Sequence, residues 1–209
     1  MENGFSQKDE SRLIGYAQEG DLDAFNRLVI FYQDMVYNQA VRVMGDVAAA
    51  QDATQDAFIS AYRNIKSYRG GSFRAWLLRI VTNACYDELR RRRRRPSTPL
   101  EPEDDEGEEI ESPQWIVDPG DQPEFHMERR DLEKAIQHCL DELPFEFREV
   151  VVLVDLQGLD YTEAAEASGK PIGTIKSRLA RARGRLRDCL KGFWELLPME
   201  FRLKNEVIQ

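Results

Sequence analysis

Residues 158–187 read GLDYTEAAEASGKPIGTIKSRLARARGRLR and carry the clearest structural signal in the chain. The spacing predicts a short helix within 160–169, capped at Thr162, and then a turn at 169–171. A long helix follows from 173, and two helices joined by a tight glycine-containing turn are typical of a helix-turn-helix unit. The inward stripe of the long helix consists of Ile175, Leu179, Ala182 and Leu186.

The outward face of this long helix is basic. Residues 176–187 contain six Lys or Arg and no acidic residue. A helix with a cationic outer face fits the phosphate-lined major groove of DNA. A solvated basic helix on any globular protein has the same composition, but the turn before this helix favours DNA binding.

The segment before the helix-turn-helix unit is also predicted to be helical. One helix spans about 132–143 and stops near Pro144, and a second covers about 145–157. The run Val150–Val154 has β propensity, but it continues the helical spacing of the residues around it, so we predict a helix there as well.

The N-terminal half shows the same kind of periodicity. Apolar residues recur every three or four positions over 13–44, which predicts amphipathic helices. Asp46 and Ser72 suit the caps of two further helices, over about 47–66 and 73–95. Alternating β-type patterns are absent from the sequence, so we expect an all-α fold.

An acidic, proline-rich stretch separates the two helical halves. Residues 96–124 contain eleven Asp or Glu, no Lys or Arg, and six of the nine prolines. Because the whole chain has a net charge of −9 and this stretch contributes −11, the remainder carries +2. We expect a flexible linker between small helical domains at 1–95 and 125–192, followed by a short extension at 193–209. The linker is either a plain tether or a source of negative charge that mimics nucleic acid or covers the arginine run of the free protein.

Composition excludes several classes of protein. No apolar run of the 209 residues approaches the roughly 18 residues of a membrane span, and the polar, acidic N-terminus is not a signal peptide. The three cysteines, Cys85, Cys139 and Cys189, are an odd number and form no CxxC motif. We therefore expect no disulfide, a reducing cytoplasmic location and no direct insertion into a membrane.

Six consecutive arginines, Arg90–Arg95, end the helix that begins after Ser72. A cationic helix end is favoured by the macrodipole, but six adjacent charges repel one another, which favours a polyanionic partner. An enzyme is not indicated. His126 and His138 have no nucleophile at a recognisable motif, and His138-Cys139 lacks two further ligands at zinc spacing, so no catalytic residue, metal or cofactor is predicted.

Several motifs resemble those of bacterial sigma factors of the sigma-70 family. Those resembling region two are DATQDAF (52–58), Tyr62 and YRGGSFRAWLLRIVTN (68–83). Those resembling region four are LPFEFREV (143–150), GLDYTEAA (158–165) and GTIKSRLARAR (173–183). No recognisable region three lies between them, so the chain resembles the compact extracytoplasmic-function (ECF) type. The resemblance implies a region-two helical bundle and a region-four helix-turn-helix domain.

The resemblance implies that region two docks on a coiled coil of the largest subunit of core RNA polymerase, and that the flap of the polymerase is a second contact. Phe58 is expected to belong mainly to the core, whereas Gln55 and Asp56 are expected to be exposed. The residues that match the polymerase-binding motif are Asp52, Gln55, Asp56, Phe58 and Tyr62.

Region two also implies capture of an unstacked base of the minus-ten element. Asn83 offers hydrogen bonds to a base edge, and the glycine pair lets a strand approach the backbone closely. Phe73 and Trp76 have core spacing and are assigned to packing. The residues that match the minus-ten segment are Tyr68, Arg69, Gly70, Gly71, Ser72, Arg74, Arg79 and Asn83.

The resemblance to region four implies that this half recognises the minus-thirty-five element of a promoter. The residues expected at base edges are Lys176, Ser177, Ala180 and Arg181. Those expected at phosphates are Thr174, Arg178 and Arg183.

Together these features predict an ECF sigma factor that binds core RNA polymerase and promoter DNA in a stress or envelope response. The family usually has an inhibitory anti-sigma partner. The competing interpretation is a stand-alone helix-turn-helix regulator, which explains the C-terminal half but neither the region-two motifs nor the arginine run. A third is a protein-interaction adaptor with incidental charge.

Overall fold

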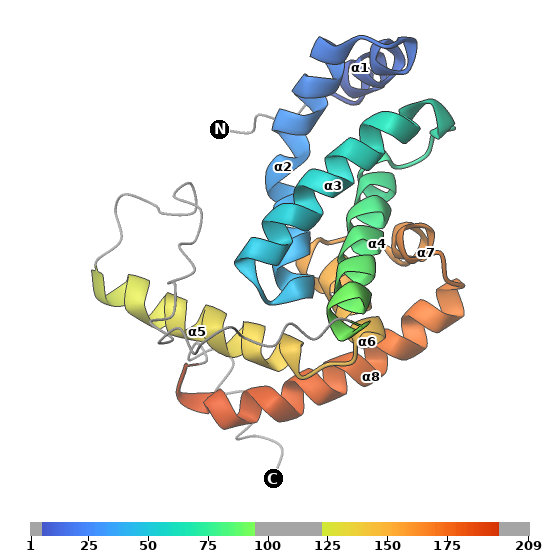
Figure 1. Ribbon diagram of the computed structural model, residues 1–209. Coiled ribbons are helices and arrows are strands. Elements are labelled where there is room, and N and C mark those ends of the chain that lie inside the picture. The colour runs from blue at the N-terminus through green and yellow to red at the C-terminus, as the bar shows by residue number, and fades with distance from the viewer. Residues whose placement is uncertain (1–5, 95–122, 197–209) are drawn as a thin grey trace.

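A computed structural model describes residues 6–94 and 123–196, and every regular element in those two ranges is helical (Figure 1). This confirms the all-α expectation. Residues 95–122 and the tail from 197 lie outside the described residues. The elements are α1 (Gln7–Glu19), α2 (Leu22–Met44), α3 (Val47–Asn64), the 3-10 turn η1 (Ile65–Ser67), α4 (Phe73–Arg94), α5 (Pro123–Asp141), α6 (Phe145–Val151), the π-helical turn η3 (Val152–Leu156), α7 (Tyr161–Ser168), α8 (Ile172–Leu190) and the 3-10 turn η4 (Lys191–Leu196).

Two helices of the N-terminal half, α3 and α4, begin at the caps that the sequence predicts. The Asp46 carboxylate accepts a hydrogen bond from the Ala49 amide at 2.7 Å, and the Ser72 hydroxyl accepts one from the Ala75 amide at 3.2 Å. α1 and α2 each end at a glycine with positive φ, which only glycine adopts without strain. None of the helices in the described residues is long and apolar enough to cross a membrane.

The C-terminal half forms the predicted helix-turn-helix unit from α7 and α8. The expected cap of α7 at Thr162 is wrong: Asp160 is the cap, because its carboxylate accepts from the amides of Thr162 and Glu163 at 2.7 and 2.8 Å. Ile175, Leu179 and Ala182 of α8 are buried, which confirms three members of the inward stripe, and Leu186 packs against them half-buried. The valine-rich run is helical as α6 and η3.

The expectation of no disulfide is contradicted. Cys139 of α5 and Cys189 of α8 are bonded, with their Cα atoms 5.8 Å apart. Their separation of 50 residues hides the pair in the sequence, because only the packing of α5 beside α8 brings the two thiols together. The free Cys85 is buried in α4. The expected absence of a disulfide was one reason to infer a reducing compartment, and that reason no longer holds.

The two halves pack against each other over one continuous core (Figure 1). α7 lies along α4, and α5 and α6 lie against the C-terminal end of α2. Arg148 donates a hydrogen bond to the Val43 carbonyl at 2.7 Å, and the Arg42 guanidinium donates one to the Gln137 side chain at 3.3 Å. In this closed arrangement the N-terminal and C-terminal halves cover part of each other.

Candidate polymerase and nucleic-acid interface

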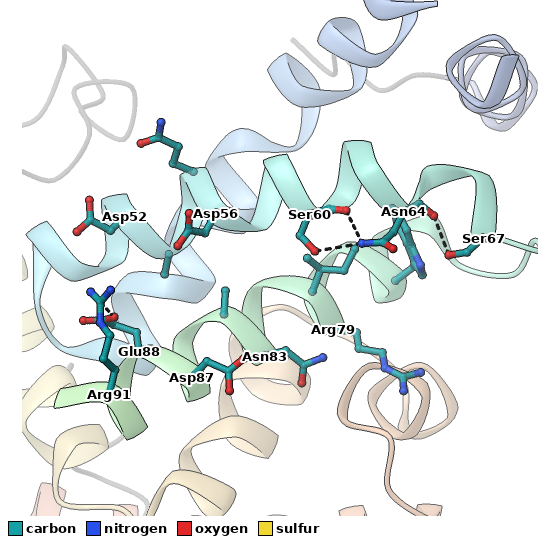
Figure 2. Close-up of a pocket in the computed structure, with 15 residues that line it drawn as sticks. Asp52, Asp56, Ser60, Asn64, Ser67, Arg79, Asn83, Asp87, Glu88 and Arg91 are labelled. Atoms are coloured by element: carbon teal, nitrogen blue, oxygen red, sulfur yellow. Dashed lines mark hydrogen bonds and ion pairs between the residues drawn. The ribbon is translucent and has the colours of Figure 1, made fainter. Parts of the chain in front are cut away.

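A groove of about 890 Å³ lies between α3 and α4. Asp52, Gln55 and Asp56 line it from α3, and Arg79 and Asn83 line it from α4 (Figure 2). The structure therefore brings together residues that the sequence assigns to two different partners, polymerase and the minus-ten element.

The charge of the groove favours a basic partner. Its lining includes four carboxylates, of Asp52, Asp56, Asp87 and Glu88, against two arginines. One of those arginines, Arg91, is already paired with Glu88 at 2.7 Å. An excess of carboxylates repels a phosphate backbone, so the groove fits a cationic protein surface better than DNA.

Gln55 and Asp56 are exposed, as expected. Phe58 is half-buried and packs against the core, which agrees with its predicted role there. Tyr62 is 41% exposed, and its ring lies 5.0 Å from that of Phe25. Ile59, also 41% exposed, lies one turn before Tyr62 and was missed, because helical spacing does not show that an apolar residue lacks a covering neighbour.

The loop between α3 and α4 is held by hydrogen bonds to its own backbone and to α1. The Gln18 side-chain amide donates to the Ile65 carbonyl at 3.0 Å and to the Tyr68 carbonyl at 2.9 Å. The Tyr68 hydroxyl donates to the Gly71 carbonyl at 2.7 Å. Gln18 was not singled out from the sequence, since nothing in its neighbourhood shows that α1 meets a loop about fifty residues later.

Gly70 and Gly71 have φ values of +98° and +92°, a region that residues with a side chain rarely adopt. Phe73 is buried, and its ring stacks on that of Trp76 at 5.2 Å. The Tyr68 ring meets both at 5.3 and 5.5 Å. The predicted packing roles of Phe73 and Trp76 are therefore confirmed, and Tyr68 closes the aromatic cluster at the loop.

Arg74 and Arg79, both assigned to the minus-ten element, face the C-terminal half. The Arg74 guanidinium donates to the Gln157 carbonyl. A Cβ placed on Gly169 of the helix-turn-helix turn would lie 3.7 Å from Nη2 of Arg79. Asn83 is exposed and faces the groove instead (Figure 2).

The four predicted base-reading residues of α8, Lys176, Ser177, Ala180 and Arg181, are all exposed. The Lys176 ammonium lies 5.5 Å from the centre of the Tyr161 ring. The Ser177 hydroxyl donates to the carbonyl of Thr174 at 3.0 Å, so it is bonded within the helix in this structure.

The side chains of the predicted phosphate-binding residues are held more by the rest of the chain than those of the predicted base-reading residues. Thr174 and Arg178 are half-buried. The Arg183 guanidinium donates to Asp155 at 3.0 Å, and this hydrogen bond raises the pKa of Arg183. Below the helix, burial raises the pKa of Glu149 to about 7, although the positive charges of Arg178 and Lys170 act to lower it.

Part of the arginine run is neutralised within the chain. Arg92 pairs with Asp46 at 3.1 Å and with Glu88 at 3.0 Å, and Arg91 pairs with Glu88. Arg90 and Arg94 are exposed. The run therefore joins the start of α3 to the end of α4 as well as presenting positive charge to solvent.

Two family models match the chain: Sigma-70 region 2 over residues 28–95 and Sigma-70 region 4 over residues 133–186. The chain belongs to the sigma-70 family. Its relatives place this sigma factor in the ECF type.

It is 36% identical over 179 residues to the ECF sigma factor SigW of Bacillus subtilis, covering 85% of this chain and 95% of that one. It is 35% identical over 188 residues to the sigma-H factor of Pseudomonas aeruginosa, covering 89% and 96%. It is 39% identical over 169 residues to the ECF sigma factor SigE of Mycolicibacterium smegmatis, where the match covers 81% of this chain but 62% of that longer relative.

Two solved structures are similar to this sigma factor across most of its length. RpoE of Bartonella quintana, in complex with the anti-sigma factor NepR, aligns with a TM-score of 0.63 and 26% identity, over 81% of this chain and 98% of that one. CnrH, in complex with the cytosolic domain of CnrY, aligns with a TM-score of 0.61 and 25% identity, over 88% and 98%.

Proposed function

We propose that this chain binds core RNA polymerase and directs promoter-specific transcription initiation in a response to stress or envelope damage. The observation that carries the proposal is that each half exposes its own set of matched residues. α3 exposes the polar residues of the polymerase-binding motif, and α8 exposes the residues expected at base edges. A protein that recognised a single DNA site would use α8 alone.

The acidic groove between α3 and α4 is the proposed docking site for the polymerase coiled coil. Asp52 and Asp56 supply charge, while Ile59 and Tyr62 offer exposed apolar area on the same helix. Charged residues steer association and buried aromatic residues anchor it, so this combination suits a protein partner. The region-four half is proposed to contact the flap.

α8 is the proposed reader of the minus-thirty-five element. Lys176 and Arg181 project from its exposed face and would contact base edges, where a bidentate pair with guanine discriminates by about 1–3 kcal/mol. Arg178 and Thr174 lie nearer the core and would contact phosphates. Arg183 would join them only after leaving Asp155.

The closed arrangement must open before both promoter elements are bound. Elements centred about 25 base pairs apart lie about 85 Å apart along a duplex. Here α7 packs directly on α4, and Arg74 is bonded to the C-terminal half. We propose that polymerase stabilises a separated form, and that an anti-sigma partner, of the kind present in the RpoE–NepR structure, opposes it.

Reconstitution tests the function. The purified chain is mixed with core RNA polymerase and a library of genomic promoter fragments, and transcripts are mapped. We expect transcription from a defined set of start sites that core polymerase alone does not use. A stand-alone helix-turn-helix regulator would bind duplex DNA without polymerase and would direct no new start site.

A further inference from the structure

Arg183 of α8 lies on the face of the helix that is assigned to DNA. It follows Lys176 by seven residues, about two helical turns, so the two side chains project from the same side. Ala180, which is also exposed, lies between them on this stripe. Arg183 would therefore meet a phosphate beside the base edges that Lys176 reaches.

Asp155 of η3 already binds the group that this phosphate would need. Nε of Arg183 donates to Oδ2 of Asp155 at 3.0 Å, and Nη2 donates to Oδ1 at 2.5 Å. Arginine makes the same pair of parallel bonds with a phosphate group, so the carboxylate and a phosphate compete for the same N–H groups. The side chains are 29% exposed for Asp155 and 52% for Arg183, which leaves the pair within reach of DNA.

Another ion pair on α8 has a different geometry. Nε and Nη2 of Arg187 both donate to one oxygen of Asp188, each at 3.3 Å. Both side chains are more exposed than those of the Arg183 pair, and exposed pairs of this kind contribute little in water. Arg187 is therefore open to a phosphate, whereas Arg183 is held.

The turn that carries Asp155 is unusual in its backbone and in its neighbours. η3 is π-helical, and the Gln157 amide donates to the Val152 carbonyl, five residues earlier, at 2.8 Å. π turns are rare in proteins and occur often at functional sites. The Gln157 carbonyl accepts from Arg74, and the Gln157 side-chain amide donates to the Met35 carbonyl at 3.4 Å. The N-terminal half therefore holds the end of the turn that supplies a partner to α8.

We propose that Asp155 is a specificity-determining residue that keeps one phosphate contact of α8 from forming, and that the closed arrangement holds it in this position. The inference rests on the proposed function of α8 and deepens it. Phosphate contacts add affinity for every DNA sequence alike, so the loss of one lowers binding of the free chain to DNA outside promoters.

Separation of the two halves changes this balance. Gln157 then loses both of its contacts with the N-terminal half, from Arg74 and to Met35. The end of η3 loosens, and Arg183 exchanges the Asp155 carboxylate for a phosphate. The chain therefore gains its full affinity for DNA only in the form that polymerase stabilises.

The test measures the salt dependence of DNA binding by the full chain. A fluorescent duplex of mixed sequence is titrated at several salt concentrations, and anisotropy gives Kd at each. Each phosphate contact adds about 0.9 to the slope of log Kd against log salt concentration. Asp155→Asn keeps the size of the side chain but not its charge, and it should steepen the slope by this amount. Between about 50 and 200 mM salt this variant should lose about threefold more affinity than the wild type.

Three further variants separate this contact from a general effect of charge. Asp188→Asn removes the same charge from the open pair with Arg187, so its slope should stay that of the wild type. Asp155→Asn combined with Arg183→Ala should return the slope to the wild-type value, since no guanidinium is released. Arg74→Ala should steepen the slope part of the way, because it removes a contact that holds the end of η3.

An unchanged slope in a folded Asp155→Asn variant overturns the inference, as does an equal increase in Asp188→Asn or the absence of DNA binding by Asp155→Asn at low salt. Asp155→Ala gives the same test if Asp155→Asn does not fold. An unchanged slope in Arg74→Ala overturns the part played by the closed arrangement. A chain that fails to bind core polymerase would refute the proposed function, and these titrations without polymerase would still decide the role of Asp155.

Discussion

The Arg74 guanidinium of α4 donates a hydrogen bond to the backbone carbonyl of Gln157, 83 residues further along the chain. A residue that the sequence assigns to promoter opening is thus occupied by the half assigned to the upstream element. The contact joins a charged donor to a part-buried carbonyl. If Arg74 contacts the opened promoter as the sequence predicts, contact between the halves and contact with DNA compete for this side chain.

Replacing Arg74 by Ala should loosen the closed arrangement. We expect a larger radius of gyration by small-angle X-ray scattering, because the population of separated halves rises. Arg69→Ala is the control, since Arg69 is exposed and bonds only within its own loop among the described contacts. If the scattering profiles of both variants match that of the wild type, the Arg74 contact does not hold the halves together.

Reduction of the Cys139–Cys189 disulfide should destabilise the C-terminal half. Opening a loop of 50 residues costs about 4 kcal/mol through the entropy of the unfolded chain. We expect dithiothreitol to lower the Tm of the wild type and to leave a Cys139→Ser/Cys189→Ser variant unaffected. Equal Tm values for the wild type with and without reductant would contradict this.

Substitution of Lys176 or Arg181 by Ala should relax the choice of promoter without loss of polymerase binding. Each lost base contact should reduce discrimination between matched and mismatched upstream elements by about 1–3 kcal/mol, or roughly 5- to 150-fold. Run-off transcription from paired templates measures the ratio. Arg187→Ala serves as the control, because Arg187 is exposed on the same helix but pairs with Asp188 at 3.3 Å.

Stability should depend on pH through Glu149. Burial raises its pKa from 4.5 to about 7, so the folded chain holds a proton that the unfolded chain releases between these values. Stability from this group is therefore full below pH 4.5 and falls as pH rises to about 7, by on the order of 3 kcal/mol. Glu149→Gln should flatten this dependence in urea unfolding at pH 5 and 8. Glu146→Gln, at an exposed position of the same helix, should retain it.

Local sequence patterns predicted most of the helices and two of the caps. Asp46 and Ser72 precede apolar periodic segments, and that arrangement depends only on neighbouring residues. The inward stripe of α8 follows from the same periodicity. Thr162 failed as a cap because Asp160, two residues earlier, offers a charged acceptor to two amides.

Apart from the cap of α7, the missed features are tertiary. The disulfide, the Gln18 bonds to the loop and the Arg183–Asp155 pair join residues 28 to 50 positions apart. Helical periodicity gives the face on which a side chain lies but not the element that meets it. The contact sets matched by resemblance to the family remain predictions, because a residue's exposure does not identify the partner that covers it.

The shared core of the two halves affects how much of this factor is needed to occupy polymerase. If most molecules are closed, the apparent affinity for polymerase is lowered by the fraction that is open. At a low concentration, the factor would then bind little polymerase in competition with sigma factors that do not need to separate two packed halves. If polymerase binds only the separated form, the packing of α7 on α4 raises the concentration of this factor that is needed to transcribe its genes.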